Sequence, residues 1–292
     1  MTVTDPESLT SRQDEDDEVL DTRLVRLRWQ RDRELREPLG PQQLSTADML
    51  TLGNAVCGFL AIYCMTTRVL IPHLEGVDVG SSRRSAATAV ILLLIGATCD
   101  LFDGLVARKL RGSALGAELD NLADLISFGL APAYFVLVWG MVSDSGHQKV
   151  SVLTAIVVMI AVVLRLARFS CVKLRPGVFQ GMPCPMGALT VISIVLLNPP
   201  FVPAVIGIAA VAGLMVSRVE YPKPRGMLAV ATLCWIVVAV GCLAAWASGA
   251  PDGFALLKVG AGLQVALALM APLLVLRRKV GAVRARRAAS RA

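Results

Sequence analysis

The stretch VLTAIVVMIAVVL, residues 152–164, decides the fold class. It holds no charged side chain, and its apolar residues do not alternate with polar ones as they would in a strand of a membrane barrel. Because a bilayer excludes unpaired backbone groups, an apolar stretch of this kind crosses it as a helix. Together with its flanking residues, the stretch predicts a transmembrane helix, which needs about 20 apolar residues.

The composition of the whole chain agrees with this stretch. The 292 residues are 55% hydrophobic and 17% charged, and their mean hydropathy of +0.64 excludes a soluble globular domain. The seven cysteines stand singly in apolar segments, and the two histidines fall in expected loops. Neither a disulfide framework, a zinc site nor histidine-based catalysis is therefore indicated, and no nucleic-acid partner is expected.

Eight apolar stretches of this kind follow one another after residue 45. They cover roughly residues 47–67, 85–107, 118–141, 150–171, 184–198, 201–217, 227–248 and 255–276. The fifth and sixth are joined by Asn198-Pro199-Pro200, and because proline breaks a helix, this junction predicts a tight helical hairpin. The expected fold is an all-α integral membrane protein with about eight transmembrane helices.

The two ends of the chain are charged rather than apolar. Residues 1–45 contain an acidic run at 14–18 and an arginine-rich segment at 23–36, and they carry no signal-peptide pattern. We expect them to form either a solvated cytoplasmic tail or a short helix lying on an anionic membrane face. Residues 277–292 are expected to form a basic cytoplasmic tail.

Lysine and arginine in the short loops predict the orientation, because these residues are retained on the cytoplasmic side. Basic residues follow the second, fourth, sixth and eighth apolar stretches, and most of the alternate loops carry little charge. The loop with Arg68, Arg83 and Arg84 is the exception. We expect a multi-pass protein of the plasma membrane with both termini in the cytoplasm.

Carboxylates cluster between the second and third apolar stretches. Asp100 and Asp103 share one face of a predicted helix, and Asp120 and Asp124 share one face of the next. Counting back from Arg108, the first two lie about 12 and 7 Å along their helix, in the cytoplasmic half of the bilayer. An ionised aspartate costs a few kcal/mol there, so the cluster needs a positive partner.

Divalent cations would supply that positive charge. Four carboxylates without histidine or cysteine suit hard ions such as Mg²⁺, Mn²⁺ or Ca²⁺, and their charge balances two of them. Paired ions can clamp phosphoryl oxygens; Gly104 and Ala107 leave room for a phosphate or nucleotide, and Arg108 offers a forked donor. The alternatives are a path for cations or protons, or pairing of the acids with arginines.

The acids and their neighbours follow the spacing Asp100-x2-Asp103-Gly104-x2-Ala107-Arg108-x7-Gly116-x3-Asp120-x3-Asp124. This pattern resembles the signature of the CDP-alcohol phosphatidyltransferases. The resemblance implies that the first three aspartates hold two metals, and that Asp124 completes the site and acts as general base on the acceptor hydroxyl. It further implies that Arg108 and Ser113 contact the CDP moiety, with clearance at Gly104.

The family also implies a domain organisation. Residues 46–225 would form its core of six spans, residues 226–276 would add two transmembrane helices, and the protein would be a homodimer. In the first predicted span, Thr51 and Asn54 are polar and three residues apart. By resemblance they contact the nucleotide; alternatively, they form hydrogen bonds between helices.

Four segments further resemble the bacterial membrane-type phosphatidylserine synthases. They are residues 116–132, Arg165-Leu-Ala-Arg168-Phe169, Phe179-Gln-Gly-Met-Pro183 and Met215-Val-Ser-Arg218. In two departures, Cys184 replaces a usual serine and Ala47-Asp48 replaces a usual Pro-Asn. This branch implies CDP-diacylglycerol, L-serine and membrane lipids as partners, with phosphatidylserine and CMP as the products.

Three arginines are candidates for binding the acceptor. Arg165 and Arg168 are three residues apart in the fourth predicted span, and Arg218 follows the sixth, all at the expected depth of the aspartates. The carboxylate of serine and the phosphate of glycerol phosphate or inositol phosphate would suit them equally. Alternatively, Arg168 and Arg218 anchor their helices at the cytoplasmic face. Only the resemblance to the branch favours serine.

Overall fold

The computed structural model describes residues 45–76, 79–109, 115–143, 147–171, 178–222 and 227–270. The charged tail predicted for residues 1–45 lies outside this range except for Ser45, and so does the basic tail predicted for residues 277–292. In chain order, the helices are α2 (Thr46–Met65), η1 (Thr66–Leu70), α3 (Ile71–Leu74), α4 (Val79–Lys109), α5 (Gly116–Asp124), η2 (Leu125–Leu130), α6 (Ala131–Ser143), α7 (Gln148–Cys171), α8 (Cys184–Leu197), α9 (Phe201–Val216) and α10 (Met227–Ala247), followed by a helix over Gly253–Met270.

Each predicted apolar stretch coincides with a helix or a run of helices. Within the described ranges, six of them are long and apolar enough to cross a membrane, and α8 and α9 are shorter apolar helices. The first and third spans each contain a π-helical turn, η1 and η2. The chain is therefore an all-α, multi-pass membrane protein, as predicted; the number of helices that cross the bilayer stays a prediction.

Local sequence signals set the ends of several helices. Ser45 caps α2: its Oγ accepts from the backbone N–H of Asp48 at 3.2 Å, and the Asp48 carboxylate accepts from the Ser45 N–H at 2.7 Å. Asp48 is part of the Ala47-Asp48 departure from the synthase pattern, and its carboxylate completes a capping box with Ser45. Asn198 ends α8 in the left-handed conformation, with φ of 46°, and Pro200 precedes α9, which confirms the predicted hairpin.

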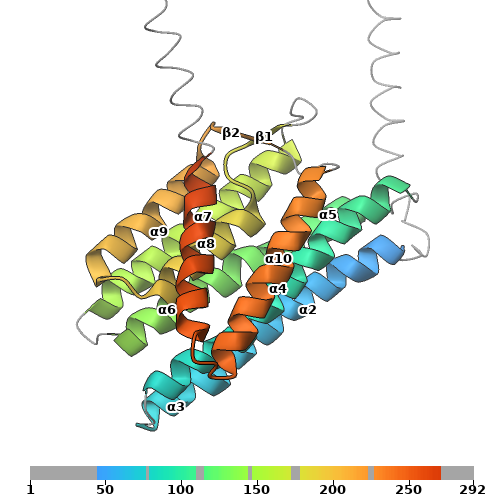
Figure 1. Cartoon of the computed structure of the whole chain (residues 1–292). Coiled ribbons are helices and arrows are strands. Elements are labelled where there is room, and N and C mark those ends of the chain that lie inside the picture. The colour runs from blue at the N-terminus through green and yellow to red at the C-terminus, as the bar shows by residue number, and fades with distance from the viewer. Residues whose placement is uncertain are drawn as a thin grey trace, which may run out of the picture. The chain divides into compact units, whose positions relative to one another are not determined.

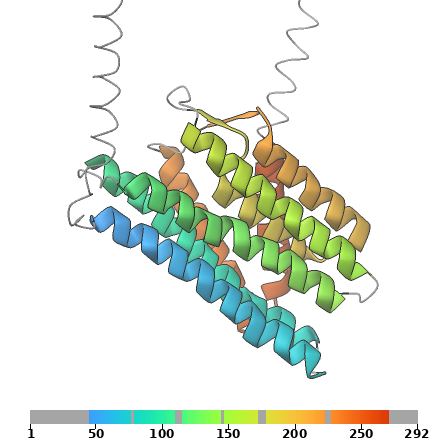
Figure 2. The same cartoon turned by 180° about the vertical axis from the view of Figure 1, so that it is seen from behind.

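Small residues let the first three spans approach closely. A side chain at Gly58 of α2 would collide with Ser127 of η2, and one at Gly96 of α4 would meet Asn54 of α2. The buried core between the helices is apolar and includes Leu93, Phe128, Phe135, Ile192 and Ile208. The bundle places the start of α2, the end of α4 and the start of α5 at one end (Figures 1 and 2).

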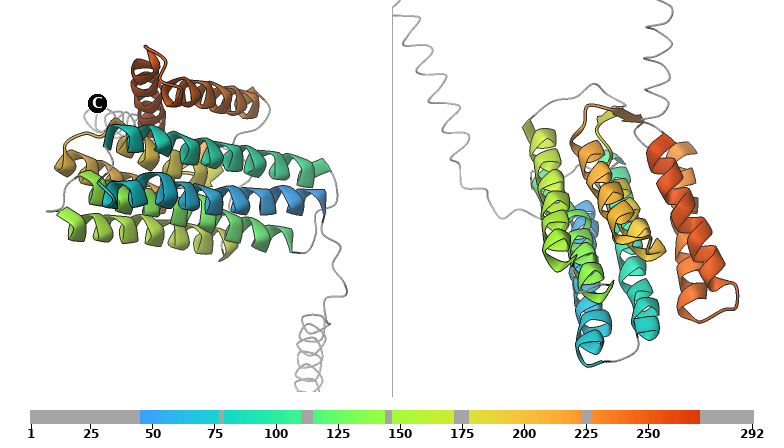
Figure 3. Two further views of the ribbon diagram at one scale, coloured as in Figure 1. Left: turned by 90° about the horizontal axis from the view of Figure 1, so that it is seen from below. Right: turned by 90° about the vertical axis from the view of Figure 1, so that its left-hand side faces the viewer.

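The last two described helices form a hairpin on one side of this bundle. In Figure 3, α10 and the helix Gly253–Met270 run beside each other, and α10 packs against α4. Trp235 Nε1 donates to Gln264 Oε1 at 2.8 Å, and Gln264 Nε2 donates to Thr190 Oγ1 of α8 at 3.5 Å. A buried polar chain therefore fixes the hairpin to the bundle.

Two short strands, which the sequence did not predict, cross the end of the bundle. Strands β1 (Val178–Gln180) and β2 (Glu220–Pro222) pair antiparallel, with Phe179 opposite Tyr221. Gly181 N–H donates to the Val219 carbonyl at 2.7 Å and continues the connection beyond the pair. The strands tie the segment before α8 to the segment after α9 (Figure 1).

Candidate active site

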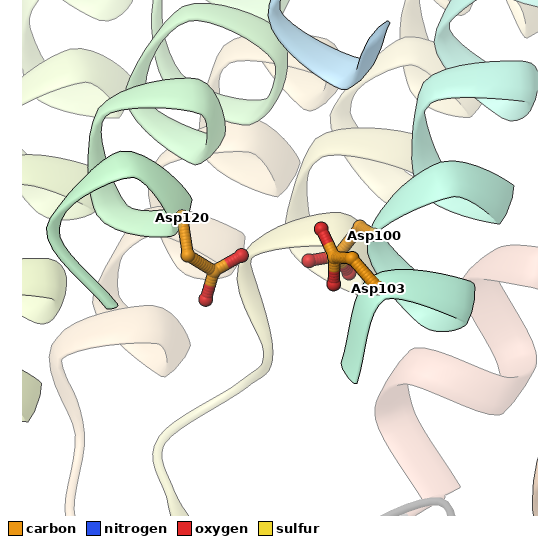
Figure 4. Close-up of side chains that lie close together, drawn as sticks. All are labelled: Asp100, Asp103 and Asp120. Carbon is orange, nitrogen blue, oxygen red and sulfur yellow. The ribbon is translucent and has the colours of Figure 1, made fainter. Parts of the chain in front are cut away.

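Three of the predicted aspartates meet at the junction of α4 and α5. Asp100 and Asp103 extend from α4, and Asp120 points toward them from α5 (Figure 4). One carboxylate oxygen from each lies within 4.8 Å of the others. Asp103 is 6% exposed, and Asp100 and Asp120 are partly buried, so three negative charges are held close together where water is only partly accessible.

Asp124 adjoins this cluster one helical turn farther along α5. Its carboxylate is close enough to that of Asp100 for the two charges to interact, and its Oδ1 accepts from Asn54 Nδ2 at 3.4 Å. The π-helical turn η2 begins at the next residue, and such turns are frequent at functional sites. The two pairs predicted from their spacing thus face each other in the folded chain.

Residues of α2 hold the aspartates from a third side. Thr51 Oγ1 donates to Asp103 Oδ2 at 2.8 Å, and both side chains are buried. Asn54 is fully buried and bridges to Asp124, while its backbone carbonyl accepts from Ser127 Oγ at 2.7 Å. Thr51 and Asn54 therefore make the interhelical hydrogen bonds that were one of their two predicted roles; nucleotide contact stays a prediction.

The polar atoms of the site fit a bound cation. Asp120 Oδ1 and Asn54 Oδ1 are buried without a hydrogen-bond partner among the described residues. An unmatched buried polar atom costs about 1–3 kcal/mol, and more when it is charged. Three converging carboxylates, one with an unmatched oxygen, are the donor set that hard divalent cations prefer.

Arg165 is the predicted acceptor-binding arginine that the fold brings to the aspartates. Its side chain is 5% exposed and lies within electrostatic range of Asp124. Its Nη1 donates to the carbonyl of Gln180 at 2.9 Å, and its guanidinium carbon lies 5.7 Å from the centre of the Phe169 ring. Burial and these contacts fix the direction of the guanidinium group.

The other two arginines have different surroundings. Arg168 Nη1 donates to the carbonyl of Val216 at 2.7 Å, at the end of α9. Cations near a helix C-terminus interact favourably with its carbonyls, which agrees with the anchoring alternative. Arg218 is exposed. Acceptor binding by these two arginines stays a prediction.

The candidates for binding the CDP moiety are only partly described. Among the described residues, no atom lies within 4 Å of a side chain placed at Gly104; that a phosphate or nucleotide occupies this space stays a prediction. Ala107 and Arg108 lie in the last turns of α4, but their side chains are outside the described part of the structure, and Ser113 lies outside the described residues altogether.

One of the two departures from the synthase pattern, Cys184, lies beside Arg165. Cys184 begins α8, is 3% exposed and hydrogen-bonds Arg165. The departure from serine at this position was visible in the sequence, but its proximity to Arg165 arises only in the folded chain, where the start of α8 lies near the end of α7. Residue 184 therefore belongs to the surroundings of Arg165.

Comparison with known proteins agrees with the geometry. The model of the CDP-alcohol phosphatidyltransferase family matches residues 44–285. The CDP-diacylglycerol–serine O-phosphatidyltransferase of Bacillus subtilis is 33% identical over 178 residues, which cover 60% of this chain and 88% of that protein. The archaetidylserine synthase of Methanothermobacter thermautotrophicus is 31% identical over 193 residues, which cover 63% of this chain and 72% of that protein.

Proposed function

The chain belongs to the CDP-alcohol phosphatidyltransferase family, and from this premise we propose that it transfers a phosphatidyl group from CDP-diacylglycerol to L-serine. The products are phosphatidylserine and CMP. The observation that carries the proposal is the meeting of Asp100, Asp103 and Asp120 from two helices. Two relatives support serine as the acceptor. Their names refer to serine or to a serine lipid, and the matched residues cover most of the length of each relative.

We propose that Asp100, Asp103, Asp120 and Asp124 hold two divalent cations, Mg²⁺ or Mn²⁺ and less favourably Ca²⁺. The unmatched Asp120 oxygen and the converging carboxylates support this assignment. When bound, such ions neutralise the oxygens of the pyrophosphate and the charge that develops on departing CMP. Thr51 fixes the Asp103 carboxylate through its 2.8 Å hydrogen bond, so one ligand is oriented before substrate arrives.

Asp124 is the proposed general base. It takes the proton of the serine hydroxyl while that oxygen forms a bond to the lipid-side phosphorus of CDP-diacylglycerol. The bond between this phosphorus and the bridging oxygen breaks, and the bridging oxygen leaves with CMP. Asn54 donates to Asp124 Oδ1 at 3.4 Å and so holds the carboxylate of the proposed base in place.

Arg165 is proposed to hold the acceptor, L-serine, by binding its carboxylate. This guanidinium is buried, held by the Gln180 carbonyl and within electrostatic range of the proposed base. A planar guanidinium can bind a carboxylate through two parallel hydrogen bonds. The same group would suit an acceptor phosphate, so glycerol phosphate and inositol phosphate are the competing acceptors. We propose that Arg168 and Arg218 also contribute to binding the acceptor.

Replacing Arg165 with glutamine is expected to raise the KM for serine about ten- to hundredfold, since a charge-assisted hydrogen bond is lost. The KM for CDP-diacylglycerol should change little. Steady-state kinetics of the purified protein in mixed micelles measures both constants. The control is Arg68→Gln, because Arg68 is exposed and bonds Thr88 Oγ1 at 3.4 Å in another part of the bundle. Equal effects of the two changes on serine KM would contradict the role of Arg165.

We propose that CDP-diacylglycerol enters from the membrane, with its CDP moiety over Gly104 and Ala107 and in contact with Arg108 and Ser113. Gly104→Ala places a methyl group in this space. Because alanine favours a helix by about 1 kcal/mol over glycine, the melting temperature should not fall. The kcat/KM for CDP-diacylglycerol should fall at least about tenfold, since small displacements of a substrate are costly.

The matched control for Gly104→Ala is Gly213→Ala in α9. Within the described part of the chain, a side chain at Gly213 also meets no atom within 4 Å, so both changes add a methyl group to a helix surface without a described neighbour. Kinetics and thermal melting of the two variants separate helix stabilisation from substrate obstruction. Unchanged kcat/KM in Gly104→Ala would argue against passage of the CDP moiety over this position.

We further propose that the active site and both termini face the cytoplasm, and that the protein acts as a homodimer. The basic loops after alternate apolar stretches support this orientation. In this arrangement, L-serine reaches the site from the cytoplasm and the lipid substrate arrives laterally. The homodimer is proposed only because the family implies it.

A panel of labelled acceptors tests the proposed function. Purified protein is incubated with CDP-diacylglycerol, Mg²⁺ or Mn²⁺, and serine, glycerol phosphate or inositol phosphate, and both lipid product and CMP are measured. We expect equal amounts of phosphatidylserine and CMP with serine alone. Turnover only with another acceptor would sink the serine assignment and leave the reaction class intact. Metal-dependent ion flux in liposomes without CMP release would identify a cation or proton transporter instead.

A further inference from the structure

The second residue of β2, Tyr221, joins the last described helix to the strands at the end of the bundle. Its side chain is 2% exposed, and its hydroxyl donates to the carbonyl of Ala268 at 3.3 Å. Ala268 lies in the last turn of the helix Gly253–Met270 that the structure describes. The helical hairpin, which the sequence suggested was an addition to the catalytic core, therefore contacts the strand pair directly.

The strand pair in turn holds the acceptor arginine. Tyr221 lies opposite Phe179, and Glu220 lies opposite Gln180, the residue whose carbonyl accepts from Arg165 at 2.9 Å. Gly181, with φ of 77°, follows directly, and a side chain there would collide with the Met215 carbonyl and lie 3.1 Å from Arg165 Nη1. Little space is therefore left around this turn, and β2 pairs directly with the residue whose carbonyl holds Arg165.

Tyr221 is also close to Arg165 itself. Burial raises the pKa of the Tyr221 hydroxyl to about 12, and the positive charge of Arg165 acts on the same group in the opposite direction. The hydroxyl therefore stays protonated and able to donate to Ala268 at physiological pH. The helix Gly253–Met270 is thus connected to Arg165 through Tyr221, by the hydrogen bond to Ala268, by the pairing of β2 with β1 and by the charge of Arg165.

We propose that Tyr221 is a positioning residue: through its hydrogen bond to Ala268 it fixes β2 and β1, and so orients Arg165 toward the acceptor. This inference rests on the proposed function, in which Arg165 binds the carboxylate of serine. It gives the hairpin of α10 and the helix Gly253–Met270 a part in acceptor affinity, although none of its described residues is placed among the aspartates.

The test compares Tyr221→Phe with Tyr134→Phe in the full-length protein. Each change removes one hydroxyl group and keeps the ring; the Tyr134 hydroxyl pairs with Thr66 Oγ1 at 2.7 Å, between η1 and α6. Steady-state kinetics with serine and with CDP-diacylglycerol, together with thermal melting, are measured for both variants and the wild type. Similar melting temperatures would show that any kinetic difference is local.

For Tyr221→Phe we expect the KM for serine to rise about three- to tenfold, the range expected from one lost hydrogen bond, with kcat and the KM for CDP-diacylglycerol nearly unchanged. Tyr134→Phe should leave all three constants at the wild-type values. Equal serine KM in the two variants, or a rise in both KM values, would overturn the positioning role alone. A wild-type protein that turns over no serine would overturn the proposed function and this inference together.

Discussion

Asp124→Asn is expected to lower kcat about a hundred- to ten-thousandfold, the range that a positioned general base contributes. Asparagine has nearly the shape of aspartate, but its amide cannot take the proton of the acceptor hydroxyl. The hydrogen bond from Asn54 at 3.4 Å and the contact with Asp100 place residue 124 within the cluster, so the effect should fall on turnover. CMP release with saturating serine and CDP-diacylglycerol measures it.

The matched control for this substitution is Asp252→Asn. Asp252 is exposed in the turn between α10 and the helix Gly253–Met270, so the same chemical change is made away from the aspartate cluster. We expect wild-type turnover from the control. Full activity of Asp124→Asn with serine and with every other acceptor would show that another group removes the proton.

Loss of the divalent cation should have an effect of similar size. Treatment with a chelator is expected to abolish CMP release, and Mg²⁺ or Mn²⁺ should restore it. Asp120→Asn removes the charge of the carboxylate that carries an unmatched buried oxygen. Replacing a residue that only hydrogen-bonds a metal ligand lowers metal affinity or activity about ten- to hundredfold. Loss of a ligand itself should therefore lower kcat at least about a hundredfold and raise the Mn²⁺ concentration for half-maximal activity.

Glu118→Gln is the control for Asp120→Asn. Glu118 is exposed in the first turn of the same helix, α5, and lies outside the group of three converging carboxylates. The control should keep its metal requirement and its turnover. If chelation left CMP release unchanged, or if both variants required the same Mn²⁺ concentration, the proposed role of Asp120 would fail.

Much of the helical architecture could be predicted because a membrane restricts the choices. Apolar stretches must be helical there, so each predicted stretch coincides with helices. The acidic cluster could also be predicted from the sequence. Spacings of three and four residues put Asp100 with Asp103, and Asp120 with Asp124, on single helix faces. Those two helices are consecutive in the chain, and the fold brings carboxylates from both together.

The surroundings of Arg165 could not be predicted in the same way. Strands of three residues are too short to show an alternating pattern, so β1 and β2 left no clear signal. The contacts of Arg165 with Cys184 and with the Gln180 carbonyl join segments that only the packing of α7 brings together. For Thr51, the sequence left two roles open, and the 2.8 Å bond to Asp103 identifies one of them.

Anomalous diffraction from crystals of the protein grown with Mn²⁺ and CDP-diacylglycerol tests the central claim most directly. The account predicts two manganese peaks per chain, both in contact with carboxylate oxygens of Asp100, Asp103, Asp120 and Asp124. Protein that is active in the same Mn²⁺ buffer but shows no manganese among these four side chains would contradict it.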